Sequence, residues 1–176
     1  MKKLSNITES LWTDIQRRSA GETIRKEDDI GNIKELIPVD MGLSVLWADK
    51  DFEIEDECYF NFNDAIEFTK NTGWRIPTKE EVKELEYTLE IKNTNEVYIL
   101  QGDFDDAPQL VFLKRGFKYG DSDRVAKEHS YSAWTSTKKD LEGMYFMATY
   151  GQYGHMGVYN SMHYLNRLCV RLVKDR

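Results

Sequence analysis

The stretch Trp74-Arg75-Ile76-Pro77-Thr78-Lys79-Glu80-Glu81 decides the fold class, because it separates two predicted helices and marks where the second begins. Thr78 and Glu81 have the spacing of a capping box, in which each side chain accepts a hydrogen bond from the backbone of the other residue. Apolar residues then recur at helical spacing at Val82, Leu85 and Leu89. The stretch therefore predicts a helix that begins directly after Thr78.

An earlier helix is predicted just before this stretch. It begins at Asn63 and includes Thr69, with Asp64 and Glu67 early in it, and negative charge is favourable near a helix N-terminus. Gly73 is suited to the position that follows the end of such a helix.

Short strands are predicted around the two helices. From Val39 to Trp47, apolar residues recur with a period of two, which predicts one strand with a buried face. After the second helix the pattern predicts strands at 96–101, 110–113, 131–135, 143–150 and 167–173. Two helices followed by short, mostly antiparallel strands predict an α+β fold.

The predicted core consists of apolar positions that follow the local period, with both helices packed on one sheet. These positions are Val45, Trp47, Ile66, Phe68, Trp74, Ile76, Val82, Leu85, Val111, Trp134, Val170 and Leu172.

The first 34 residues differ in character from the rest and are predicted to be an attachment arm, residues 1–34, ahead of one domain, residues 35–176. Ile7, Leu11 and Ile15 have the spacing of a short amphipathic helix, and the charged segment 21–34 has no sustained period. The arm has few apolar anchors, so we expect it to bind a partner chain and the remainder to fold without it.

Composition excludes several classes of protein. A net charge of −7 over 176 residues argues against a nucleic-acid partner, which would require a basic face. No apolar run approaches the roughly 20 residues of a membrane-spanning helix. The N-terminus lacks the apolar region of a signal peptide, so the expectation is cytoplasmic synthesis, with display on a virion or surface by a partner.

Motifs for catalysis and for cofactor or metal binding are not found in the sequence. There is no Gly-x-Ser-x-Gly elbow and no phosphate-binding loop, and His129, His155 and His163 lack the spacing of metal ligands. Acidic stretches beginning at Asp49 and Asp103 lack the Gly and Glu of a calcium loop. We therefore expect no enzyme, cofactor or metal, and the alternative is a small enzyme with a site near Asp103, Asp105 and Asp106.

Residues 143–166 contain no Asp, Glu, Lys or Arg, although charged residues make up 31% of the chain. The run holds five Tyr and four Gly residues together with two Asn and one Ser, residue types that are typical of adaptable binding loops, in which tyrosine gives large contact area at low entropic cost. The candidate ligand-binding residues are Tyr145, Tyr150, Gln152, Tyr153, His155, Tyr159, Asn160, Ser161, His163, Tyr164 and Asn166. The alternative is a tyrosine-rich antiparallel hairpin whose aromatic rings pair across the strands.

Four segments in this order resemble the Fibrobacter-type major paralogous domain proteins over about residues 38–174. They are Val39-Asp40-Met41-Gly42-Leu43-Ser44-Val45-Leu46-Trp47-Ala48, Gly73-Trp74-Arg75-Ile76-Pro77-Thr78-Lys79-Glu80-Glu81, Trp134-Thr135-Ser136-Thr137 and Cys169-Val170-Arg171-Leu172-Val173. The resemblance implies a C-type-lectin-like fold related to the variable proteins of diversity-generating retroelements. In those proteins the stretch that matches residues 145–166 displays the ligand-binding side chains.

This resemblance implies a non-enzymatic module that recognises a protein or glycan on a cell surface. Residues 8–15 and 21–28 also resemble an attachment segment of gut-bacterial prophage proteins. A structural piece of a larger particle is the alternative.

The calcium-binding motifs of lectins are missing, and Cys58 and Cys169 lie too far apart in sequence to match the catalytic cysteines of the fold's oxidases. Whether these two cysteines pair or are only small buried residues is left open by the sequence.

Overall fold

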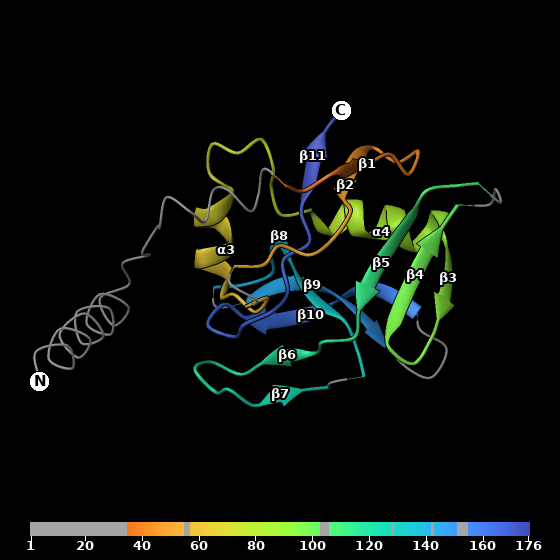
Figure 1. The fold of residues 1–176 in the computed structure, drawn as a ribbon. Helices are drawn as coiled ribbons and strands as arrows, with labels where there is room; N and C mark the ends of the chain where they lie inside the picture. Colours follow the sequence, from red (N-terminus) through yellow and green to blue (C-terminus); the bar gives the residue numbers. More distant parts are fainter. Residues whose placement is uncertain (1–34, 55–56, 103–105, 128, 142, 151–154) are drawn as a thin grey trace, which may run out of the picture.

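The computed structural model describes residues 35–54, 57–102, 106–127, 129–141, 143–150 and 155–176. Over these residues the fold is α+β, with two helices and mostly antiparallel strands in small sheets, as predicted (Figure 1). The predicted arm, residues 1–34, lies outside the described residues, as do Asp103 and Asp105 of the acidic cluster.

The first sheet joins the beginning of the domain to its C-terminal end. β1 (Pro38–Val39) pairs with β2 (Val45–Ala48), which pairs with β11 (Val173–Asp175). The prediction of one strand from Val39 to Trp47 is wrong, because the two residues face each other across a hairpin. Gly42 takes a positive φ of 75° in its turn, and its N–H donates to the Asp40 carboxylate at 2.9 Å.

The helices follow the capping signals. α3 (Phe62–Thr69) is capped by Asn61, two residues before the predicted start, and its C-cap is Lys70 rather than a residue beside Gly73. α4 (Lys79–Thr88) begins as predicted, with both hydrogen bonds of the Thr78–Glu81 capping box present.

Two larger sheets form the body of the domain. β3 (Glu90–Asn93), β4 (Val97–Gln101) and β5 (Gln109–Leu113) form one, and β8 (Ser132–Lys138), β9 (Gly143–Tyr150) and β10 (His155–His163) form the other. β6 (Phe117–Lys118) and β7 (Val125–Ala126) form a small hairpin. The strand predicted at 167–173 is mostly a series of single bridges, for example from Leu168 to Phe60 and from Cys169 to Ala133.

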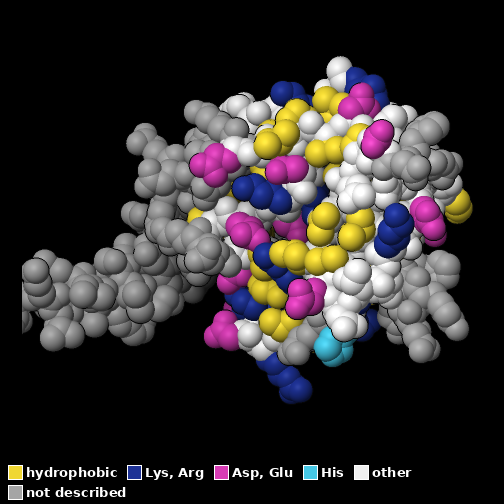
Figure 2. Space-filling view, turned by 45° about the vertical axis from the view of Figure 1, so that its right-hand side comes forward, with side chains coloured by type: hydrophobic (Ala, Val, Ile, Leu, Met, Phe, Trp, Pro, Cys, Tyr) yellow, Lys and Arg dark blue, Asp and Glu magenta, His cyan; other side chains and the backbone are white. Residues whose placement is uncertain are grey.

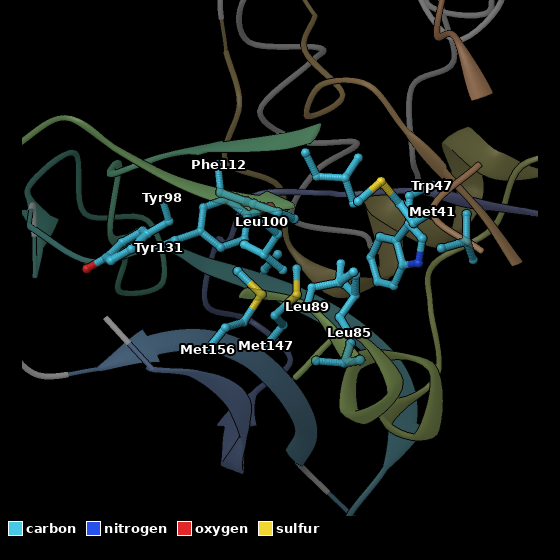
Figure 3. Close-up of a cluster of buried hydrophobic side chains, with 14 of the residues drawn as sticks. Met41, Trp47, Leu85, Leu89, Tyr98, Leu100, Phe112, Tyr131, Met147 and Met156 are labelled. Carbon is cyan, nitrogen blue, oxygen red and sulfur yellow. The ribbon is translucent and has the colours of Figure 1, made fainter. Parts of the chain in front are cut away.

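The core has two clusters of buried side chains. Figure 3 shows the first, in which Leu85 and Leu89 of α4 meet Leu100 of β4, Met147 of β9 and Met156 of β10. The second cluster includes Ala65 and Phe68 of α3, together with Trp134 of β8. Both helices pack against the sheet of β8, β9 and β10, α3 through a Phe62–Trp134 ring contact of 5.6 Å.

Ten of the twelve predicted core residues are buried, Trp134 completely. Ile66 is half-buried. Val111 is 38% exposed, so its assignment to the core is wrong. In β5 the alternation has the opposite phase, because Leu110 and Phe112 point inward.

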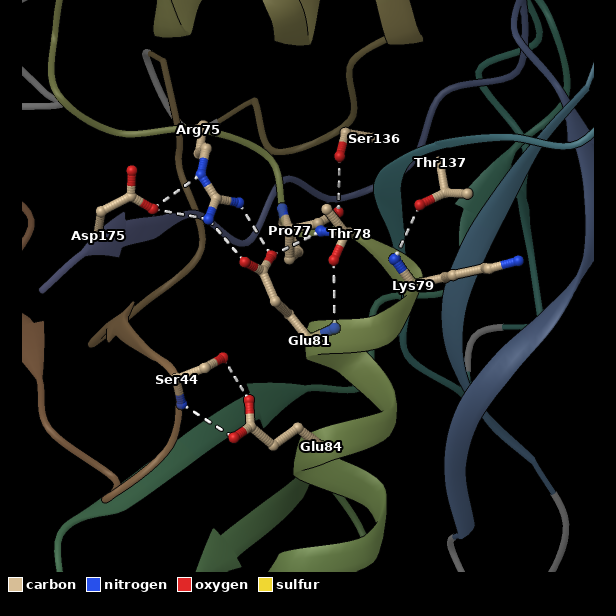
Figure 4. A network of polar contacts seen from close by, with 10 residues as sticks. All are labelled: Ser44, Arg75, Pro77, Thr78, Lys79, Glu81, Glu84, Ser136, Thr137 and Asp175. Atoms are coloured by element: carbon tan, nitrogen blue, oxygen red, sulfur yellow. Dashed lines mark hydrogen bonds and ion pairs between the residues drawn. The ribbon is translucent and has the colours of Figure 1, made fainter.

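Two polar networks connect distant parts of the chain. Arg75 forms a bidentate pair with Glu81 of α4 and also binds Asp175 of β11, while the Lys79 N–H donates to Thr137 of β8 (Figure 4). The second network is buried: Arg171, 1% exposed, donates to Asp51 at 2.8 Å, and the Tyr131 hydroxyl donates to the same carboxylate oxygen at 2.6 Å.

Candidate functional site

The charge-free run 143–166 forms the β9–β10 hairpin and the turn that follows β10. The sequence predicted a strand at β10 only under the alternative in which the run is a tyrosine-rich hairpin. Gln152 and Tyr153 lie outside the described residues, and so do the side chains of Tyr150, His155, Asn160 and Ser161. The remaining candidates are Tyr145, Tyr159, His163, Tyr164 and Asn166.

Tyr145 and Tyr159 belong to the packing of the hairpin. Tyr145 is half-buried, with the Lys79 ammonium 4.7 Å from the centre of its ring. Tyr159 is also half-buried and pairs across the strands with Phe146, the ring centroids being 6.1 Å apart. For these two residues the structure therefore resembles the hairpin alternative.

His163 and Tyr164 lie at the end of β10, where the chain leaves the sheet. His163 is exposed and its ring stacks on the half-buried Tyr164 ring, with centroids 4.6 Å apart and planes 22° from parallel. The Leu165 N–H donates to Nδ1 of His163 at 3.2 Å, and Leu165 itself is 55% exposed. This turn thus presents two stacked rings and an apolar side chain.

Asn166 and Arg167 hold this turn against the one after β6. The Gly120 N–H donates to Oδ1 of Asn166 at 3.1 Å, and Nδ2 of Asn166 contacts Sδ of Met162. Arg167 donates to the carbonyls of Gly120 at 2.9 Å and Ser122 at 2.7 Å. Asn166, predicted as a displayed ligand-binding residue, is therefore used to position the turn.

Tyr119 is brought beside this turn by the same contacts. It lies between Lys118, which exchanges two backbone hydrogen bonds of 2.9 Å with Arg167, and Gly120. Its ring is 58% exposed and stands edge-on to Phe117, with centroids 4.8 Å apart. We call Tyr119, His163, Tyr164 and Leu165 the turn surface.

A hollow of about 500 Å³ shares Tyr119 with the turn surface and is lined mainly by β7 and the residues beside it. Its walls include Tyr119, Ser122, Arg124, Val125, Lys127 and His129. Its polar and basic wall next to an exposed ring suits a ligand that combines hydrogen-bonding groups with a flat or apolar part.

Sequence reasoning missed Tyr119 and Leu165. Leu165 lies inside the charge-free run, so counting apolar as well as polar residues of the run would have included it. Tyr119 lies in a charged segment far from the run, and only the contacts of Asn166 and Arg167 bring it to the turn.

A second exposed surface lies on the outer side of the β3–β4–β5 sheet. Val97 pairs with Leu113 and Ile99 with Val111, and these four side chains lie on the outward positions of their strands. We call them the sheet face. Figure 2 turns this side of the molecule forward and shows hydrophobic side chains interrupted by charged ones. At its edge, Lys92 and Gln109 both donate to Oε1 of Gln101, at 3.0 and 2.9 Å.

No group of three or more His, Cys, Asp and Glu side chains gathers as metal ligands in the part of the chain that the structure describes. Within that part, no helix has the length and apolar character needed to cross a membrane. Asp106, the described member of the acidic cluster, is exposed.

Comparison of the chain with protein-family models, curated proteins and solved structures finds no match.

Proposed function

We propose that this protein is a non-enzymatic ligand-binding module whose recognition site is centred on the turn surface. The observation that carries the proposal is the group of exposed Tyr119, His163 and Leu165, with the half-buried Tyr164 ring stacked on His163. These residues lie on turns that Asn166 and Arg167 fix to one another. Aromatic rings on a fixed backbone lose little freedom on binding, so most of their contact energy becomes affinity.

The neutral run supports this reading. Charged side chains must lose their water when an interface forms, and this cost is absent from residues 143–166. Tyrosine and histidine can both donate hydrogen bonds and cover apolar surface. The proposed ligand is accordingly a protein or glycan on a cell surface, bound by ring contacts at the turn surface and by polar contacts in the neighbouring hollow.

The finer assignments are part of the same proposal. The α+β architecture is compatible with a C-type-lectin-like fold, and the position of the neutral run near the C-terminus is compatible with a phage or retroelement variable protein. Sequencing the adjacent DNA tests the latter: a reverse transcriptase gene and a near-repeat of the 3′ end of the coding sequence are expected.

The binding experiment uses the full chain on a glycan array and a panel of purified surface proteins. The variant Tyr119→Ala, Tyr164→Ala, Leu165→Ala should bind each recognised ligand at least about 30-fold more weakly, the loss of roughly 2 kcal/mol typical of interface anchors. Its melting temperature should stay within a few degrees of that of the wild type, since exposed substitutions change stability little.

The matched control is Val111→Thr, Leu113→Thr on the sheet face. This variant should retain wild-type affinity. Equal affinities of the turn variant and the wild type would contradict the proposal, and unfolding of the turn variant would assign its residues to the structure of the domain instead.

The sheet face favours a second candidate, a structural piece of a larger assembly that also attaches through residues 1–34. Its four aliphatic side chains are suited to burial against another apolar surface. Sedimentation of the wild type and the Val111→Thr, Leu113→Thr variant tests it: assembly that the substitutions abolish would support the structural role.

A further inference from the structure

Two cysteines far apart in the sequence lie in contact inside the domain. Cys58 and Cys169 are 111 positions apart, yet both lie in the first core cluster and each shifts the pKa of the other. Both are free thiols in the structure. Both belong to the first core cluster, so neither thiol lies on an open surface.

Backbone pairing on both sides fixes the position of this pair. Phe60 exchanges two hydrogen bonds of 2.9 and 3.0 Å with Leu168, which aligns the Cys58 segment with the Cys169 segment. Cys169 is also held against β8, because its N–H donates to Ser132 at 3.0 Å and its carbonyl accepts from Trp134 at 3.2 Å. The chain thus brings two thiols together without any local sequence motif.

The two thiols have different surroundings. Cys58 is 5% exposed and within the influence of the Arg115 charge, whereas Cys169 is completely buried. The hydrogen bond from Cys169 lowers the pKa of Cys58, and the charge of Arg115 acts in the same direction. The hydrogen bond to Cys58, followed by burial, raises the pKa of Cys169 well above its usual value. A thiol of lowered pKa beside a thiol of raised pKa is an arrangement suited to thiol–disulfide exchange.

We propose that Cys58 and Cys169 form a site of reversible disulfide formation, with Cys58 as the attacking thiol, Cys169 as the resolving thiol and a low-molecular-weight disulfide as the oxidant. The bond would tie the segment before α3 to the C-terminal segment that supports the turn surface.

The exchange proceeds in two balanced steps. The Cys58 thiolate attacks one sulfur of the small disulfide, the oxidant's S–S bond breaks, and one thiolate leaves. The Cys169 thiol then gives up its proton and attacks the Cys58 sulfur of the mixed disulfide, expelling the second thiolate. Two protein thiols are oxidised, the oxidant is reduced to two thiols, and the protons pass to the expelled thiolates.

The test incubates the reduced, folded full chain with oxidised glutathione and follows intact mass. The wild type should lose two hydrogen masses, and peptide mapping should show Cys58 joined to Cys169 in the monomer. Cys169→Ser should retain one glutathionyl group on Cys58, whereas Cys58→Ser should remain unmodified, because Cys169 is completely buried and its pKa is raised. Closing so long a loop should raise the melting temperature by about 10 °C.

Arg115 provides a second readout that does not depend on protein stability. In the Cys169→Ser background, Arg115→Gln should slow glutathione addition several-fold, and Arg115→Lys should restore most of the rate. A wild type that keeps both thiols in the oxidising buffer, that forms a disulfide between chains, or that accumulates the mixed disulfide would overturn the proposal. Equal modification of the two single-cysteine variants would also overturn it.

Discussion

The turn surface and the sheet face are both exposed, but they are held in place differently. On the turn surface, irregular backbone is fixed by Asn166 and Arg167, whose side chains bond to backbone groups of the neighbouring turn. On the sheet face, regular strands are fixed by their ladder, and the side chains are aliphatic.

This difference indicates different uses. Rings with polar atoms can remain hydrated when no ligand is present and still supply contact area when one binds. Aliphatic side chains on a flat sheet gain only by burial against another apolar surface. We therefore assign recognition to the turn surface and, at most, packing to the sheet face. Substitutions beneath and on each surface test this assignment.

The largest effect is expected beneath the sheet face, at Arg171. Its guanidinium binds Asp51 and also donates to the carbonyls of Ala48, at 2.9 Å, and Val111 of β5, at 2.5 Å. Arg171→Ala should lower the free energy of unfolding by about 3–5 kcal/mol, because it leaves a buried carboxylate without its cationic partner. Urea unfolding measures the loss. The double variant Asp51→Asn, Arg171→Met should lose less, and a greater loss would show that charge pairing is not the cause.

A comparable loss is expected beneath the hairpin that leads to the turn surface. Trp134 is completely buried and its Nε1 donates to the Phe60 carbonyl at 2.7 Å. Trp134→Ala should cost about 3–5 kcal/mol of unfolding free energy, as emptied aromatic core sites do. Trp134→Phe is the milder control. If the alanine variant melts like the wild type, the second core cluster does not support the hairpin.

A smaller effect is expected at the contact that holds the turn surface. Asn166→Ala removes the acceptor of the Gly120 N–H and should cost about 1 kcal/mol of unfolding free energy. Ligand affinity should fall as well, although residue 166 is not part of the turn surface, because one of the contacts that fix the two turns to each other would be lost. Asn166→Asp keeps an acceptor oxygen and serves as the control. Unchanged affinity in the alanine variant would show that the turns need no such fixing.

The smallest effect is expected on the sheet face. Val111→Thr replaces a partly exposed methyl group by a hydroxyl and keeps the β-branched shape. The unfolding free energy should change by no more than about 0.5 kcal/mol, as is usual for exposed positions. Urea unfolding checks this. A loss several times larger would place the sheet face in a packed interface.

Local signals predicted the helices well, because their causes lie within a few residues. Thr78 and Glu81 satisfy each other's backbone, so the start of α4 depends on nothing distant. A period of two in the apolar residues is a less specific signal for the bounds of a strand. Val39 of β1 is half-buried, and Met41 and Leu43 are buried in the connection that leads to β2, so Val39 to Trp47 shows the pattern expected of one strand.

The candidate site was predicted only in part, because its residues meet through long-range contacts. The absence of charge in residues 143–166 distinguishes this region from the rest of the chain, but it does not separate Tyr159, which packs in the hairpin, from the exposed His163. Nothing near Tyr119 in the sequence indicates that the turn after β10 lies beside it. The contact of Cys58 with Cys169 likewise depends on the bridge between Phe60 and Leu168.

The central claim, that the turn surface is the recognition site, is tested most directly by backbone amide hydrogen exchange. The full chain would be measured free and saturated with a ligand selected on the arrays. We predict slower exchange in the ligand complex within residues 118–124 and 163–167, with little change in residues 97–101 and 109–113. Protection confined to β4 and β5 would contradict the claim and assign binding to the sheet face.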